Sequence, residues 1–217
     1  MERTIAVEPY RLTVLWDDPA APILYTVSEA GDARALFASL PAPRPILVCI
    51  EGTDWDRDLS PWPAEKVFRG GGDFSGGAEG FLHTLLTKIV PAAEGDLSPA
   101  WRAVFGYSLA GLFSLWAMTK TDAFRRCASV SGSLWFDGFA DYLSAHPLLG
   151  RPDRAYLSLG DREEKAKNPR MQTVRAATEE AAQIIARQGV PCAFELNPGG
   201  HFQDVLARQR RAVLSLL

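Results

Sequence analysis

The chain has 217 residues, of which 47% are hydrophobic and 23% charged, and its formal net charge is −3. This length suits one α/β domain over residues 1–217 better than two domains. Lysine and arginine are scattered without a basic stripe, which argues against a nucleic-acid partner. No apolar run reaches the roughly 18 residues of a membrane helix, and the N-terminus lacks the apolar core of a secretory signal. We therefore expect a cytoplasmic protein with no membrane partner.

The three cysteines lie in apolar, strand-like segments at Cys49, Cys127 and Cys192. Their number is odd and no C-x-x-C is present, so we expect reduced core residues, with neither a disulfide framework nor a metal site. A cysteine nucleophile is disfavoured because buried strand cysteines lack the electropositive surroundings that lower a thiol pKa.

Short apolar runs rich in Val, Ile, Leu and aromatic residues predict strands over 11–16, 22–28, 45–51, 101–108, 126–132, 154–160 and 190–196. Helical patterns cover 32–40, 78–93, 108–120, 171–189 and 202–217. Strand and helix alternate after the first strands, which predicts an α/β fold with a mostly parallel central sheet. The strands are apolar on both faces, so we expect helices on both faces of that sheet.

Two long irregular stretches, 51–77 and 132–153, each follow a predicted strand, and such loops build the ligand crevice of an α/β sheet. The glycine-rich part, 69–77, fits neither the phosphate-binding P-loop pattern nor G-x-G-x-x-G. We interpret it as a loop beside the site rather than a phosphate cradle.

A serine stands where a predicted strand becomes a predicted helix, in "VFGYSLAGLF" around Ser108. At such a turn the strand and helix backbones nearly touch, and Gly106, Ala110 and Gly111 are small enough to allow it. The motif reads G-x-S-x-A, with alanine where the strict nucleophile elbow has glycine. The alternative is an ordinary strand-to-helix turn.

A serine nucleophile needs a base, and the chain has only three histidines. His83 lies within a helical pattern and His146 precedes a proline, so both are better read as packing or surface residues. His201 follows "NPGG" directly after the last predicted strand, where two glycines let the backbone carry an imidazole back over the strand ends. We therefore expect His201 to be the base, with a loop or helix-capping histidine as the alternative.

The acid should follow an intermediate strand, because the chain order in α/β hydrolases is serine, acid, histidine. The segment after residue 160 supplies Asp161, Glu163 and Glu164, and Asp137 follows the preceding strand. We prefer Glu163 because a G-x-x-acid turn returns the side chain over the strand end. Such a carboxylate fixes the imidazole tautomer.

Acyl transfer also needs donors for an oxyanion. One is the backbone N–H of Leu109, the residue after the serine. We expect the second from the loop after the third apolar strand, at Gly52 or Thr53, because glycine lets a backbone approach a ligand closely.

The predicted elbow and six further segments, which follow the family's order along the chain, resemble one family. The elbow "VFGYSLAGLFSLWA" resembles that of the "Putative esterase" family of α/β hydrolases, which includes the enterobactin and salmochelin esterases. The same family is resembled by six other segments, which are "APILYTVSEAGD", "EGTDWDRDLSPWP", "GGAEGFLHTLLTKIVPAAE", "SGSLWFDG", "LGDREEKAKNPRM" and "NPGGHFQDV". The family's D-G after the "LY" strand is replaced here by "SEAG".

The resemblance implies a Ser–acid–His esterase of the α/β-hydrolase fold that needs no cofactor or metal. Ser108 and His201 match its motif positions, and Glu163 matches the acid loosely. In the siderophore-hydrolysing branch an arginine and aromatic residues hold the substrate, and Trp55, Arg57 and Trp135 could serve here.

The predicted function is therefore a serine hydrolase that cleaves small-molecule esters through an acyl-enzyme. There are two alternatives: an acyltransferase that uses the same site, and a binding module that retains the fold without the chemistry.

Overall fold

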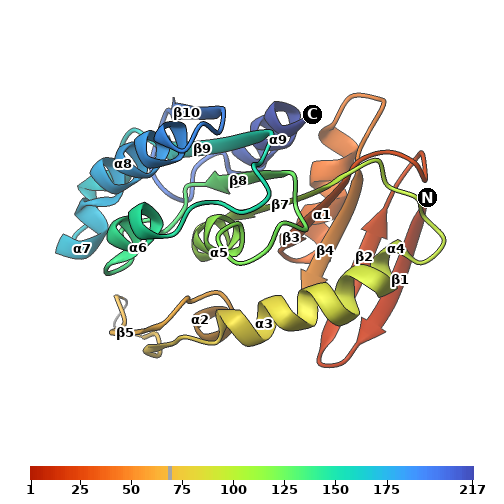
Figure 1. Ribbon diagram of the computed structural model, residues 1–217, viewed down its shortest axis with the longest axis horizontal. Helices are drawn as coiled ribbons and strands as arrows, with labels where there is room; N and C mark the ends of the chain where they lie inside the picture. Colours follow the sequence, from red (N-terminus) through yellow and green to blue (C-terminus); the bar gives the residue numbers. More distant parts are fainter. Residues whose placement is uncertain (68–69) are drawn as a thin grey trace.

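An eight-stranded sheet forms the centre of the computed structural model, which describes residues 1–67 and 70–217 (Figure 1). Its order is β1-β2-β4-β3-β7-β8-β9-β10. The strands are β1 (Glu2–Val7), β2 (Tyr10–Leu15), β3 (Ile23–Val27), β4 (Ile46–Glu51), β7 (Arg102–Tyr107), β8 (Arg126–Val130), β9 (Arg154–Gly160) and β10 (Cys192–Asn197). β1 and β2 are antiparallel to their neighbours, and the strands from β4 to β10 run parallel. The predicted mostly parallel α/β sheet is confirmed.

All seven predicted strands are present, but β1 was not predicted. Its side chains alternate between exposed and half-buried along the edge of the sheet, so its sequence lacks a continuous apolar run. The segment 45–51, expected to be the third strand, is therefore the fourth. A small second sheet pairs β5 (Pro63–Ala64) with β6 (Phe74–Ser75). Residue 69 of the glycine-rich stretch lies outside the described residues.

Helices cover both faces of the sheet, as predicted. On one face lie α1 (Ala30–Ser39) and α9 (Val205–Leu216). On the other face lie α3 (Ala78–Thr84), α4 (Val90–Glu94), α5 (Leu109–Ala117), α6 (Phe139–Ala145) and α8 (Val174–Arg187). Three short pieces, α2 (Trp55–Asp58), α7 (Pro169–Gln172) and a 3₁₀ turn at Glu163–Lys165, lie in the connections.

The helix predicted over 78–93 exists, but its middle turn widens into a π-helix at Leu85–Ile89. Pro91 lies just beyond, and its ring cannot follow an ordinary helical turn. The region 132–153, expected to be irregular, contains α6. His83 and His146, set aside as catalytic candidates, are both exposed, on α3 and at the end of α6.

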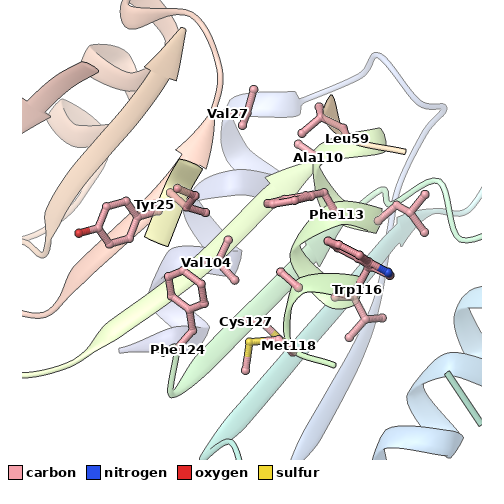
Figure 2. Close-up of a cluster of buried hydrophobic side chains, with 14 of the residues drawn as sticks. Tyr25, Val27, Leu59, Val104, Ala110, Phe113, Trp116, Met118, Phe124 and Cys127 are labelled. Carbon is pink, nitrogen blue, oxygen red and sulfur yellow. The ribbon is translucent and has the colours of Figure 1, made fainter. Parts of the chain in front are cut away.

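The core under the predicted elbow is apolar and closely packed. All nine residues of α5 are buried, and Figure 2 shows Phe113 and Trp116 of this helix near Val104 of β7 and Cys127 of β8. A helix buried on all sides fixes its own N-terminus firmly, which holds the turn before it in place.

The neighbouring strands β3 and β7 send their helices to opposite faces, because α1 follows β3 on one face and α5 follows β7 on the other. Their pairing ends at Tyr25 and Val104, before either strand ends. A crevice at the carboxyl ends of strands that separate in this way is where open α/β sheets bind ligands.

Cys49 and Cys127 are buried in the core and Cys192 is half-buried at the start of β10, and all three are free thiols. Burial raises the pKa of Cys49 and of Cys192 to about 11. Among the described residues, no helix combines the length and apolar character needed to cross a membrane.

Candidate active site

Ser108 occupies a strained turn between β7 and α5, with φ 58° and ψ −122°. A non-glycine residue rarely adopts such a backbone, and strain of this kind concentrates at functional sites. Gly106 makes the turn possible, since a Cβ there would lie 2.4 Å from the backbone of Ala110. At Gly111 a Cβ would lie 3.0 Å from the carbonyl oxygen of Gly106. The small residues around the serine are therefore required by the close approach of strand and helix.

Three side chains from separate segments form one chain of hydrogen bonds. The Nε2 of His201 lies 3.1 Å from the Oγ of Ser108, and the Nδ1 lies 2.7 Å from a carboxylate oxygen of Glu163. Ser108 follows β7, Glu163 follows β9 and His201 follows β10, so the ends of three parallel strands bring them together.

The other candidate acids form contacts elsewhere. Asp161 accepts a hydrogen bond from the Gly199 N–H at 2.8 Å, Glu164 pairs with Arg175, and Asp137 pairs with Arg170. Glu163 is therefore the one of the four acids that the structure brings to His201.

The carboxylate of Glu163 is buried and fully occupied. Its second oxygen accepts hydrogen bonds from the Gly160 N–H at 2.7 Å and from Arg208 at 2.9 Å. Burial is the largest single influence and favours the neutral acid, but it is outweighed by the hydrogen bond and charge of His201 together with donors at Gly160 and Ser131. The pKa of Glu163 consequently lies below its usual value of 4.5, and the group is a carboxylate at neutral pH.

Arg208 was not predicted, yet it is the most completely enclosed charge near the site, with 0% of its side chain exposed. Its guanidinium donates to Glu163 and also to the Ser131 hydroxyl and the carbonyl oxygens of Pro198 and Gly200, each of these three at 3.0 Å. It thereby ties the acid to the loop that carries the histidine.

A signal for Arg208 did exist in the sequence. The buried positions of α9 are 208, 209, 212, 213 and 216, which is the apolar spacing of an amphipathic helix. Arginine and glutamine occupy the first two. Polar residues on the buried face of a helix require polar partners.

The predicted oxyanion donors need one correction. The N–H of Leu109 stands at the first position of α5 and has no acceptor among the described residues. Gly52 and Thr53, however, follow the fourth strand and not the third. A Cβ on Gly52 would lie 2.9 Å from the carbonyl oxygen of Pro9, so this glycine is explained by the turn between β1 and β2.

The loop after the true third strand runs from Ser28 to Ala30. The Ser28 N–H donates to Ile50 at 3.3 Å, and the Ala30 N–H donates to Glu51 at 3.2 Å. The N–H of Glu29 between them has no acceptor within residues 1–67 and 70–217. Because β3 is the direct neighbour of β7, this N–H is the better candidate for the second donor.

Two cavities lie near the serine–histidine pair: His201 lines one, and Tyr107, the residue before Ser108, lines the other. The first, which we call the apolar pocket, has a volume of about 220 Å³ and is lined by His201, Trp135, Met171, Val174 and Phe202 among others. The second, which we call the acidic cleft, has a volume of about 390 Å³. Its walls are the β3–α1 loop, the end of β4 with Gly52 and Thr53, Trp55, Tyr107 and the start of α9.

Two of the three predicted substrate-binding residues line these cavities, Trp135 in the apolar pocket and Trp55 in the acidic cleft. Arg57 lines neither. Its guanidinium instead donates to the buried carboxylate of Asp58 at 2.8 Å, and its side chain packs beneath Gly77. This local pairing accounts for Arg57 without a substrate.

A family model described as "Putative esterase" matches residues 26–211, which is most of the chain. A relative of 26% identity is the uncharacterized protein YbbA of Bacillus subtilis, with the match covering 72% of this chain. The matched region spans 64% of that relative's length.

Solved structures with similar folds include the siderophore hydrolase EstA from Aspergillus nidulans, at 21% identity and a TM-score of 0.70, covering 100% of this chain and 93% of the other. An IroE-like serine hydrolase from Shewanella oneidensis has 15% identity and a TM-score of 0.78, covering 100% and 78%. The enterobactin and salmochelin hydrolase IroE has 22% identity and a TM-score of 0.72, covering 100% and 93%.

At these identities the solved structures establish the fold alone, and they agree with the α/β-hydrolase architecture predicted from the sequence. The family match extends from β3 to α9 and so includes the elbow, the acid and the histidine loop. The chain therefore belongs to the "Putative esterase" family, as its sequence predicted.

Proposed function

We propose that the chain hydrolyses small-molecule carboxylic esters through a covalent acyl-enzyme on Ser108. The observation that carries this proposal is the unbroken series of hydrogen bonds from the strained serine through His201 to Glu163, with heavy-atom distances of 3.1 and 2.7 Å. These distances lie within the range in which a base can take a proton from a nucleophile.

In the first half of the reaction, His201 takes the hydroxyl proton of Ser108 while the serine oxygen attacks the ester carbonyl carbon. The carbonyl oxygen becomes an anion, which the N–H groups of Leu109 and Glu29 stabilise. The intermediate then collapses, the bond to the alcohol oxygen breaks, and His201 gives its proton to the departing alcohol.

In the second half, His201 takes a proton from water, whose oxygen attacks the acyl carbon. Collapse of this second intermediate releases the carboxylic acid and returns the proton to Ser108. Glu163 remains ionised throughout and stabilises the imidazolium that forms twice in each cycle.

Arg208 acts as a positioning residue in this scheme. It touches no substrate but fixes the second carboxylate oxygen of Glu163 and the carbonyl groups of the histidine loop. Such supporting contacts set the orientation of the groups that do react.

The test is intact-mass spectrometry after incubation with a fluorophosphonate, which reacts with activated serines. We expect one adduct on the wild type and none on Ser108→Ala. Ser133→Ala is the matched control, because its hydroxyl lies only 3.4 Å from that of Ser108 and the adduct should persist. Folded wild type that takes up no fluorophosphonate would overturn the proposal and favour the non-catalytic binding module.

A further inference from the structure

The acidic cleft contains a polar side chain that the protein itself leaves unused. Gln209 on α9 is only 7% exposed and lines this cleft. Its amide has no hydrogen-bond partner within residues 1–67 and 70–217, whereas its neighbour Arg208 has several. Neither of the Gln209 amide atoms is among the buried polar atoms that lack a partner, so the amide is reached by solvent from the cleft that this residue lines. A ligand in the cleft can replace that water as the hydrogen-bond partner of the amide.

The charges around Gln209 are negative and only partly balanced. Glu51, at the end of β4, accepts two hydrogen bonds of 3.1 Å from Arg11, which neutralises it. Glu29 and Asp32, at the start of α1, line the same cleft and have no cationic partner among the described residues. The cleft thus keeps an excess of negative charge next to a free amide.

The exposed indole of Trp55 completes the lining, with 41% of the residue accessible. Carboxylates, an amide oxygen and an aromatic ring are together the groups that bind an ammonium ion. An anionic group in this cleft would instead meet unpaired carboxylates.

The mechanism decides which part of an ester occupies this cleft. The departing alcohol must lie near the Nε2 of His201, and His201 lines the apolar pocket. The acyl part then extends to the other side of Ser108, past Tyr107 and the β3–α1 loop, which line the acidic cleft.

We infer that the acidic cleft is an acyl-group subsite for esters whose acid part carries an ammonium group, with Gln209 and Asp32 as its specificity-determining residues. This inference rests on the proposed function.

The test compares three p-nitrophenyl esters of equal length, those of 6-aminohexanoate, heptanoate and pimelate. They differ only in a terminal ammonium, methyl or carboxylate group, and their leaving group is the same. After correction for hydroxide hydrolysis, we expect kcat/KM to be highest for the ammonium ester, about five- to tenfold above the methyl ester, and lowest for the carboxylate ester. That factor is the size that one or two solvent-exposed ion pairs produce.

Variants locate the effect in the cleft. The quantity compared is the ratio of kcat/KM for the ammonium ester to kcat/KM for the methyl ester. Asp32→Asn and Gln209→Leu should each lower this ratio, and Gln209→Glu should raise it. Asp141→Asn, which removes an exposed carboxylate from α6 outside the cleft, is the matched control and should leave the ratio unchanged. Circular dichroism verifies that each variant is folded.

A methyl ester cleaved as fast as the ammonium ester would overturn the inference, as would a ratio insensitive to all the cleft variants. A charge preference seen instead among acetates of 6-aminohexanol and heptanol would overturn the assignment of the acyl side. In each case, continued fluorophosphonate labelling of Ser108 leaves the proposed function standing. Absence of labelling on Ser108 would overturn both the proposed function and the acyl-group subsite.

Discussion

Replacing Arg208 by methionine removes the charge that holds Glu163 while keeping much of the side-chain volume. Four acceptors then lose a donor: the buried carboxylate of Glu163 and hydroxyl of Ser131, and two partly buried carbonyl groups of the histidine loop. Removing one member of a buried ion pair typically costs about 3–5 kcal/mol. We expect the free energy of unfolding of Arg208→Met, measured by urea denaturation, to fall by about that amount.

The effect on catalysis should fall on kcat, since Arg208 contacts the acid and not the substrate. A displacement of the catalytic groups by about 1 Å can cost a hundredfold in rate, so we expect kcat to fall about 10²-fold in the folded variant while KM changes little. Arg208→Lys keeps a charge but cannot reach all four acceptors, and it should recover part of both losses.

A double-mutant cycle with Glu163→Gln separates positioning from a general structural role. If Arg208 acts through Glu163, the double variant should be no slower than the slower single variant. The reasoning would be refuted by folded Arg208→Met with wild-type kcat, or by losses that multiply in the double variant.

Three further outcomes follow from the structure. Gly106→Ala should lower the free energy of unfolding, measured by urea denaturation, by about 3 kcal/mol. Gly31→Ala should leave it unchanged, because no atom lies within 4 Å of its new Cβ. Equal changes in the two variants would contradict the elbow geometry. The pKa of Glu163 is lowered below 4.5 in the folded state, so its ionisation stabilises the fold above that pH. The difference in the free energy of unfolding between wild type and Glu163→Gln should therefore shrink below about pH 4.5. A difference that grows below this pH would contradict the lowered pKa. The pKa of Cys49 and of Cys192 is raised to about 11 in the native protein, so both thiols should react with Ellman's reagent at pH 8 roughly a hundred times more slowly than in the unfolded chain. Equal rates in the native and unfolded chains would refute their burial.

The sheet was predictable because its central strands are buried on both faces and therefore appear as continuous apolar runs. The strand at Glu2–Val7 was not, since an edge strand with alternate residues exposed lacks that pattern. This omission had a consequence for function. Because this strand was missed, the segment 45–51 was counted as the third strand instead of the fourth. The second oxyanion donor was therefore placed at Gly52 and Thr53 and not in the loop after β3.

The candidate site was predictable where its signal is local. The elbow depends on small residues next to the serine, and only one histidine follows a strand end with glycines before it. Glu163 was preferred among four acids from its spacing after Gly160. Arg208 and Gln209 were missed because an amphipathic helix was expected to turn its polar residues outward, although their spacing from Ala212, Val213 and Leu216 places them on its buried face.

The neighbouring positions of Arg208 and Gln209 on α9 constrain how this protein can diverge. A shift or rotation of the helix that reshaped the acidic cleft would also pull the guanidinium away from Glu163. New substrate ranges should therefore arise through single substitutions at position 209, or through insertions around α2, whose side chains make no hydrogen bond to Ser108, His201 or Glu163 among the described residues. Across related sequences, the helix should keep its length and register while the connection around α2 varies.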